Sequence, residues 1–123
     1  CRSYPRNQYH AEMEAGYALK NSTLEGVLMR YANFSDGVWE KDSFLNCSFR
    51  EAFLTNLRIA KVELQNVDLS GADLFQTMLG KIDLSSCNIE GIRVSESVRE
   101  LKEATIDAAQ AVVLAKLLGV HVK

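Results

Sequence analysis

The sequence has a single proline, Pro5, among its 123 residues, and its charged residues are scattered along the chain. Both features argue against a disordered protein. No apolar run approaches the roughly 20 residues that cross a bilayer. No basic start followed by a hydrophobic stretch is present either, so we expect no membrane segment and no secretion signal. With 47% apolar residues, one globular domain is the expected class.

Cysteine is also scarce, and its pattern excludes two kinds of stabilising site. The three cysteines, Cys1, Cys47 and Cys87, form an odd set without a CxxC pair. A disulfide framework or a zinc site is therefore not expected, and a reducing cytoplasm is the predicted location. Because the chain begins with Cys1 instead of Met, we expect a truncated start rather than a lipid-anchored cysteine.

Neither charge nor catalytic motifs indicate an enzyme or a DNA-binding protein. The chain carries 14 basic and 16 acidic residues, whereas a strong non-specific nucleic-acid binder is usually basic. It lacks GxGxxG, P-loop, HExxH and GxSxG motifs. His10 and His121 stand in opposite terminal segments without neighbouring ligands, and surface roles are expected for both. We predict no catalytic residue, no metal, no cofactor and no direct nucleic-acid contact.

A repeat of five residues is the dominant feature of the sequence. Every fifth residue from Leu19 to Val94 is large and apolar. The predicted core ladder within this series is Leu24, Met29, Phe34, Trp39, Phe44, Phe49, Leu54, Ile59, Leu64, Leu69, Leu74, Leu79, Leu84 and Ile89. The residue two places before each member is mostly small and uncharged, and the other positions are mostly polar. This period fits neither a helix nor a strand.

A chain that turns a corner every five residues explains the period. Two side chains of each five would point inward, one large and one small, and four sides would close a coil of about twenty residues. Coils would stack at about the strand spacing of 4.8 Å. The predicted fold is therefore an all-β solenoid, a right-handed quadrilateral β-helix over residues 17–94, preceded by an irregular segment 1–16. Cys47 and Cys87 would be buried small residues ~10 Å apart, too far for a disulfide.

Some inward positions depart from this pattern. Asp42 falls at a small inward position, where an unpaired charge is costly, and we expect it to rotate outward or bond free backbone. Gly37 and Asp42 flank the bulky Trp39, which predicts local distortion. Large residues at three further small positions predict a wider coil: Leu57, Ile82 and Ile92.

The last segment, 95–123, is predicted to hold a linker, a helix and a short tail strand. Asp107 is a good N-cap, Ala108 to Leu118 favours a helix, and Gly119 is placed to end it. Val120 to Val122 alternates like a strand. The helix is apolar nearly all round, so we expect one face on the last coil and another on a partner. Alternatively, Leu101 and Ile106 cover the second face within the chain.

Short stretches of the repeat carry a family resemblance. The pattern small-x-(Leu/Phe)-x-x, as in Ala32 to Asp36 and Ala72 to Gln76, resembles the pentapeptide-repeat family. Tyr31 to Ser35 with Glu40-Lys41 is similar to the quinolone-resistance (Qnr-type) members. So is the ending, which contains Ser86 to Val94, Asp107, Gln110-Ala111 and Leu117 to Val120.

This resemblance implies a partner and an assembly. It implies a rod-shaped homodimer joined through C-terminal helices that binds DNA gyrase or topoisomerase IV as a DNA mimic and protects the enzyme against quinolones. The residues predicted for the dimer interface are Val113, Leu114, Leu117 and Leu118.

A generic protein-interaction scaffold without topoisomerase activity is the alternative function. It is suggested by apolar residues at outward positions, Leu28, Val38, Leu45, Phe53, Phe75 and Met78. The possible partner surface combines three of these with acidic residues: Asp68, Asp73, Asp83, Phe53, Phe75 and Met78.

Overall fold

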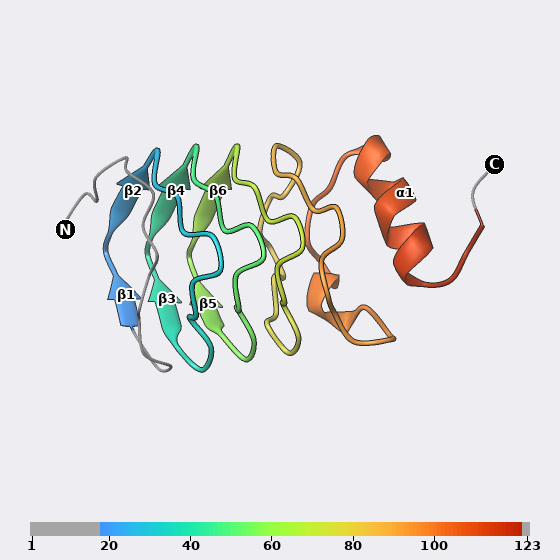
Figure 1. The fold of residues 1–123 in the computed structure, drawn as a ribbon, viewed down its shortest axis with the longest axis horizontal. Coiled ribbons are helices and arrows are strands. Elements are labelled where there is room, and N and C mark those ends of the chain that lie inside the picture. Colours follow the sequence, from blue (N-terminus) through green and yellow to red (C-terminus); the bar gives the residue numbers. More distant parts are fainter. Residues whose placement is uncertain (1–17, 122–123) are drawn as a thin grey trace.

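The computed structural model describes residues 18–121. Cys1, His10, Tyr17 and Val122 lie outside the described residues, as does the predicted N-terminal segment. Six short strands come first: β1 (Ala18–Lys20), β2 (Thr23–Glu25), β3 (Val38–Glu40), β4 (Ser43–Leu45), β5 (Arg58–Ala60) and β6 (Glu63–Gln65). A 3-10 turn, η1 (Arg99–Leu101), and one helix, α1 (Ala108–Leu117), follow them (Figure 1).

The strands lie in parallel ladders, one strand from each turn of the chain. One sheet has the order β1-β3-β5 and the other β2-β4-β6. In their registers Leu19 pairs with Trp39 and Trp39 with Ile59. Two further columns of parallel bridges complete the turn: Leu28–Ser48–Asp68–Asn88 and Asn33–Phe53–Asp73–Arg93. The chain therefore winds through four columns, and the stack of turns is visible in Figure 1.

Residues twenty apart in sequence thus lie above one another, as in the hydrogen bond between Asn66 and Asn46. We call residues 18–37, 38–57, 58–77 and 78–97 the first to fourth coils. Corners recur with the same period. From residue 21 to residue 81 every fifth residue has a positive φ, including Asn21, Lys41, Lys61 and Lys81. One left-handed residue per five turns the chain, which is why polar residues and glycine fill many of these positions.

The large apolar residues of the repeat fill the interior of the stack. All members of the predicted core ladder are buried except Ile59, which is half-buried. Four aromatic rings, including that of Trp39, pack together in the core. The Trp39 ring centroid lies 4.7 Å from that of Phe44 and 5.3 Å from that of Phe49. Cys47, Cys87, Leu57, Ile82 and Ile92 at the small inward positions are also buried.

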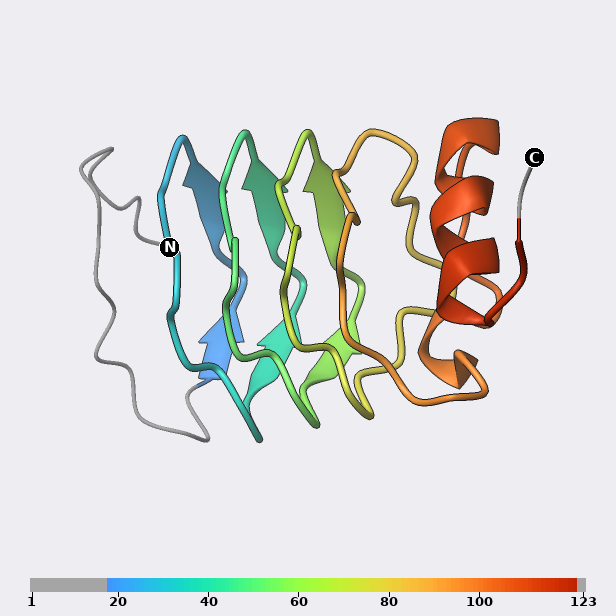
Figure 2. The same cartoon turned by 45° about the vertical axis from the view of Figure 1, so that its right-hand side comes forward.

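Residues 98–106, within the segment expected as a linker, instead form part of a fifth coil. Leu79 N–H donates to Glu100 O at 2.7 Å, and Asp83 bridges to Thr105. Both pairs are two residues out of step with the twenty-residue register, because η1 and its flanking turns hold extra residues. Leu101 is buried and Ile106 packs against the core, so both cover the end of the stack within the chain. Figure 2 shows the short orange turn η1 and the red helix α1 at that end of the stack.

The helix α1 is tied to the last complete coil by its first turn. Asp107 Oδ1 accepts from Gln110 N–H at 2.8 Å, and Gln110 Oε1 accepts from Asp107 N–H at 2.9 Å. The Gln110 side-chain amide donates to Leu84 O at 2.6 Å and Cys87 O at 2.7 Å. This capping box therefore orients the helix as well as satisfying its end.

The structure places the residues that were predicted for the dimer interface and for the tail strand. Val113, Leu114 and Leu117 are partly buried against the chain's own core, whereas Leu118 is 55% exposed. Three of the four residues predicted for the dimer interface thus face the last coil. Val120 and His121, the first two residues of the predicted tail strand, take part in no strand among the described residues.

Asp42 does not rotate outward but bonds a backbone N–H, which was the alternative expectation, and it does so through one of its two oxygens. Its side chain is 1% exposed; Oδ1 accepts from Ser22 N–H at 2.8 Å, and Oδ2 has no hydrogen-bond partner. Burial raises the pKa of this carboxyl, against the lowering effect of the Ser22 hydrogen bond. A small inward position thus holds a carboxylate that is poorly solvated when ionised.

Replacing Asp42 with Asn should therefore increase the free energy of unfolding at pH 7 by about 1 kcal/mol. The amide keeps an acceptor for Ser22 N–H and removes the buried charge. Chemical denaturation measures the change, and Asp36→Asn, at an exposed corner, is the matched control.

The gain should shrink in acid. The native state holds the Asp42 proton more tightly than the unfolded state, so the stability of the parent protein rises as pH falls through the raised pKa. An equal difference between parent and Asp42→Asn from neutral to acidic pH would contradict this assignment.

Candidate partner-binding surface

Outward side chains of the repeat form columns along the stack, and one of the four sides is rich in aromatic residues. Phe53 and Asp73 are bridge partners there, with Arg93 next in the column. Phe53 and Phe75 are each 45% exposed, and Tyr31, at the adjacent corner, is 63% exposed. We call these five residues the aromatic face. Exposed apolar side chains flanked by charges are typical of protein-binding surfaces.

The predicted partner-surface residues do not all lie together. Phe53, Asp73 and Phe75 belong to the aromatic face, whereas Asp68 lies in the preceding column. Met78 and Asp83 follow in the fourth coil, on the sides that continue the two sheets. Three of the six predicted residues therefore lie on one surface, and the other three lie on other sides of the coil.

The acidic residues have a local role that sequence reasoning missed. Asp68 accepts from Ser70 N–H at 2.9 Å, and Asp83 accepts from Ser85 N–H at 2.9 Å. Asp73 accepts from Phe75 N–H at 3.2 Å. Each carboxylate thus closes a turn over two residues, and hydrogen bonds from Ser85 lower the pKa of Asp83. The recurring Asp or Asn before each large residue was the available signal.

The two described thiols are placed as core residues. Cys47 is 3% exposed and its Sγ donates to Leu24 O at 3.3 Å. Burial raises the pKa of both Cys47 and Cys87, which disfavours the reactive thiolate. Neither arrangement is suited to nucleophilic chemistry.

Among residues 18–121, no cluster of His, Cys, Asp or Glu could hold a metal ion. His121 is exposed at the C-terminal end. No helix within the same residues is long and apolar enough to cross a membrane.

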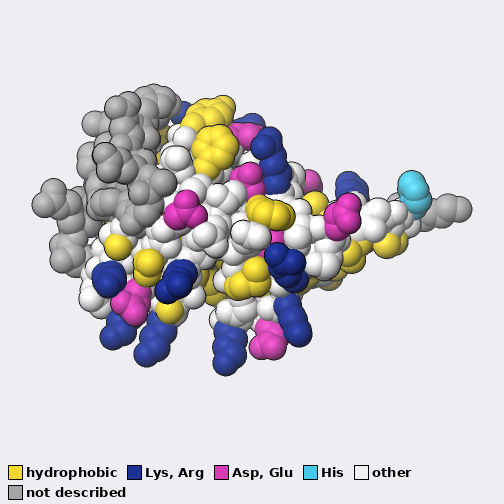
Figure 3. Space-filling view, turned by 90° about the horizontal axis from the view of Figure 1, so that it is seen from below, with side chains coloured by type: hydrophobic (Ala, Val, Ile, Leu, Met, Phe, Trp, Pro, Cys, Tyr) yellow, Lys and Arg dark blue, Asp and Glu magenta, His cyan; other side chains and the backbone are white. Residues whose placement is uncertain are grey.

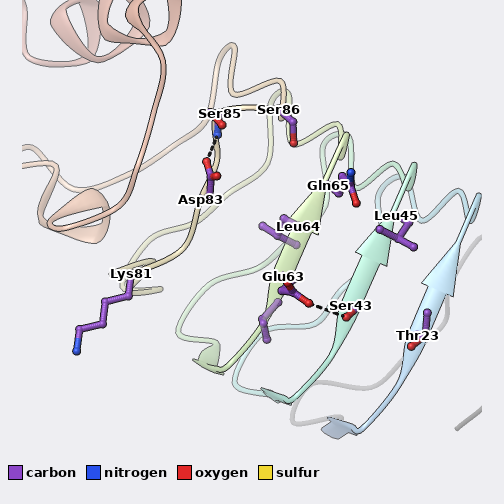
Figure 4. A pocket seen from close by; sticks show the side chains of 11 residues that line it. Thr23, Ser43, Leu45, Glu63, Leu64, Gln65, Lys81, Asp83, Ser85 and Ser86 are labelled. Atoms are coloured by element: carbon purple, nitrogen blue, oxygen red, sulfur yellow. Dashed lines mark hydrogen bonds between the residues drawn. The ribbon is translucent and has the colours of Figure 1, made fainter.

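A groove of about 680 Å³ lies over the β2-β4-β6 sheet. Glu63 and Gln65 of β6 form one wall, and Asp83 and Ser85 of the fourth coil lie across from them (Figure 4). Ser43 donates to Glu63 at 3.5 Å within it. The groove therefore opens where the third and fourth coils face each other.

This architecture defines a repeat scaffold with a filled core and columns of outward side chains, and sequence comparison supplies the family. Residues 43–76 and 54–91 match the model of pentapeptide repeats, with eight copies. Residues 43–91 therefore carry the repeat of the pentapeptide-repeat family. No curated protein matches the chain significantly.

Solved structures give fold likenesses only. The pentapeptide-repeat protein Rfr23 from the cyanobacterium Cyanothece 51142 is 18% identical, with a TM-score of 0.41 over 76% of this chain and 63% of that chain. The chain thus spans less than two thirds of Rfr23. A trypsin-treated form of QnrB1, a plasmid-mediated fluoroquinolone resistance protein, is 14% identical, with a TM-score of 0.43 over 98% and 96% of the two chains.

Proposed function

We propose that this chain is a non-enzymatic binding rod, a right-handed four-sided β-helix whose sides present side chains to a protein partner. The four columns of parallel contacts and the filled interior support the rod. The aromatic face supports the binding role, because it offers three exposed rings beside an acidic and a basic side chain.

The proposed partner is DNA gyrase or topoisomerase IV, in the bacterial cytoplasm, with protection against quinolones as the result. One observation carries this choice. The C-terminal stretch that resembles the quinolone-resistance proteins has a defined structural role here, because Gln110 joins the helix to Leu84 and Cys87. The same stretch positions α1 at the end of the stack, where the rod would extend into an assembly.

A generic interaction scaffold is the second candidate. The aromatic face favours it, since exposed Phe53 and Phe75 would suit many protein partners. It predicts binding through the same side chains without any effect on topoisomerases.

Purified protein should restore gyrase supercoiling that a fluoroquinolone has inhibited. Phe53→Ser combined with Phe75→Ser should abolish the effect, while Arg50→Ala, exposed on another side, should keep it. Loss of protection with an unchanged fold, checked by circular dichroism, would identify the aromatic face as the contact. No change in gyrase or topoisomerase IV activity at any protein concentration would exclude the topoisomerase proposal and leave the scaffold.

We further propose that two chains join through α1, using a different set of side chains from that expected. Val112 is 38% exposed and Leu118 is 55% exposed, and Val120 beyond the helix is 54% exposed. These residues remain apolar and uncovered, whereas Leu114 and Leu117 pack on the core. A two-fold contact would cover them and end the growth of the stack.

Sedimentation of the parent protein should therefore give about twice the 13.7 kDa chain mass. Val112→Glu with Leu118→Glu should give a folded monomer, because two like charges would meet their symmetry mates. Lys102→Glu, exposed in the fifth coil and outside the helix, is the control and should stay dimeric. A parent protein that sediments as a monomer at tens of micromolar would exclude this interface.

A further inference from the structure

The stack opens between the third and fourth coils on two of its four sides. Within the described residues, no backbone hydrogen bond joins 58–65 to 78–85. The other two sides are closed, with Leu69 N–H donating to Asn88 O and Leu74 N–H to Arg93 O, both at 2.8 Å. The strands β5 and β6 are consequently the last of their sheets.

Along the two open sides, the fourth coil forms backbone hydrogen bonds with the fifth coil and not with the third. Leu79 N–H donates to Glu100 O and Lys81 N–H to Glu103 O in the fifth coil. The regular corner is also lost at Ser86, which is not among the positive-φ residues, and its hydroxyl replaces a backbone acceptor for Asn66 N–H at 3.0 Å. Pairing with the fifth coil therefore holds residues 79–84 away from β5 and β6.

This opening leaves backbone groups of β5 without partners. In the same corner column, Asn21 N–H donates to Glu40 O and Lys41 N–H to Ala60 O, each at 2.9 Å, whereas Lys61 N–H has no acceptor within residues 18–121. Because backbone groups of a parallel strand alternate in direction, Ile59 N–H also faces the opening, and it too has no partner. The interior of the stack thus contains an edge of the kind that accepts an added strand.

The space beside this edge is a crevice with a partly apolar lining. One part, of about 630 Å³, is lined by β5, Asn56, Leu57, Gln76 and Met78, and it extends over β3 and β1 to Val38, Glu40 and Lys20. A second part, of about 370 Å³, shares Ile59 and Met78 and continues to Lys81 and Lys102. Ile59 is half-buried and Met78 is 46% exposed, so an apolar side chain could pack between them.

The charges around the crevice select the occupant. Exposed cations line it, namely Lys20, Arg58, Lys81, Arg99 and Lys102, against the two anions Glu40 and Glu103. Figure 3 shows Lys and Arg side chains gathered along one edge of the molecule. The groove over β6 is flanked by Glu63 and Asp83 and lacks this excess of positive charge.

We propose that the crevice beside β5 binds an extended acidic peptide segment of a partner protein, which adds as a strand to Ile59 and Lys61. Backbone hydrogen bonds to the free edge hold the peptide, an apolar side chain packs between Ile59 and Met78, and its carboxylates face the surrounding cations. This binding does not require that the partner be a topoisomerase.

Amide hydrogen exchange on the full chain tests the free edge. The amides of Ile59 and Lys61 should exchange at least about tenfold faster than those of Trp39 and Lys41, their equivalents one coil earlier. Equal protection of the two pairs would mean that the crevice is closed, and would overturn the proposal.

A synthetic peptide of alternating glutamate and valine tests the occupant. It should slow exchange at Ile59 and Lys61, whereas the same peptide N-methylated at alternate residues should not bind, because it cannot pair with the edge. Lys81→Glu should weaken binding by about fivefold or more, and Lys41→Glu, on the same corner column outside the crevice, by less than about twofold. The proposal would be overturned if the N-methylated peptide bound equally well, or if both variants lost affinity equally. It would also be overturned if the crevice were occupied only by a second copy of this chain.

Discussion

Replacing Phe49 with Ala should lower the free energy of unfolding by roughly 3–5 kcal/mol, as for other buried aromatic residues. The Phe49 ring is fully buried and lies 5.9 Å from Phe34 and 5.3 Å from Phe44, measured between ring centroids. Its loss would leave a cavity between coils, and three neighbouring rings would lose contacts at once. Urea denaturation followed by circular dichroism measures the change.

Arg50 is the matched control because it is the next residue on the same side of the second coil and its side chain is exposed. Arg50→Ala should cost less than about 0.5 kcal/mol. Similar losses for Phe49→Ala and Arg50→Ala would mean that the inward register of the repeat is wrong.

Replacing Glu100 with Ala should cost about 3 kcal/mol, since it leaves buried donors without an acceptor. The Glu100 side chain is fully buried. It accepts from Gln76 N–H at 2.9 Å, from Ser95 N–H at 3.1 Å and from the Ser95 hydroxyl at 2.8 Å. It thereby joins the end of the third coil to the turn that starts the fifth. Glu100→Gln keeps the shape and should cost less than Glu100→Ala.

The contribution of Glu100 should depend on pH in the opposite sense to that of Asp42. Burial alone would raise the pKa of Glu100, but the hydrogen bonds from Gln76 and Ser95 outweigh it and hold the pKa below its ordinary value. Its stabilising contribution is complete above the unfolded-state pKa and is lost as pH falls through the folded-state pKa. A difference between parent and Glu100→Gln that stays constant on acidification would contradict this role.

The repeat could be predicted from sequence because its period is imposed by packing. Each side of a coil needs one large apolar side chain that points into the core. Residues such as Phe34, Leu54 and Leu74 occupy these positions at a fixed spacing in the sequence, so the spacing alone reveals them. The predicted ladder contacts between Leu24, Phe44 and Leu64 appear in the register of β2, β4 and β6. Ile59 is the exception, and its partial exposure follows from the opening beside β5.

The end of the stack could not be predicted in the same way. The fifth coil is held by Glu100, whose carboxylate accepts from Gln76 N–H across a spacing of 24 residues, which is not a multiple of the five-residue period. The helix was apolar on nearly every face, so only the anchoring of Gln110 to Leu84 and Cys87 decides that Leu114 and Leu117 face the core.

The surface was predictable only in part because outward residues obey no packing rule. Phe53 and Phe75 come together on the aromatic face, but Asp68, Met78 and Asp83 are separated by the corners of the coil. The crevice depends on missing hydrogen bonds at Ile59 and Lys61, and those follow from how residues 79–84 pair with the fifth coil.

Disulfide cross-linking tests the twenty-residue register most directly. Ser43 and Glu63 are Cα partners in β4 and β6, so their Cα atoms should lie about 4.8 Å apart, within the range for a disulfide. Ser43→Cys with Glu63→Cys should therefore form an intramolecular disulfide under mild oxidation, detected by mass spectrometry of the digested protein. Ser43→Cys with Gln65→Cys, two residues out of register, should not. Efficient cross-linking of the second pair, or none of the first, would contradict the stacked-coil architecture.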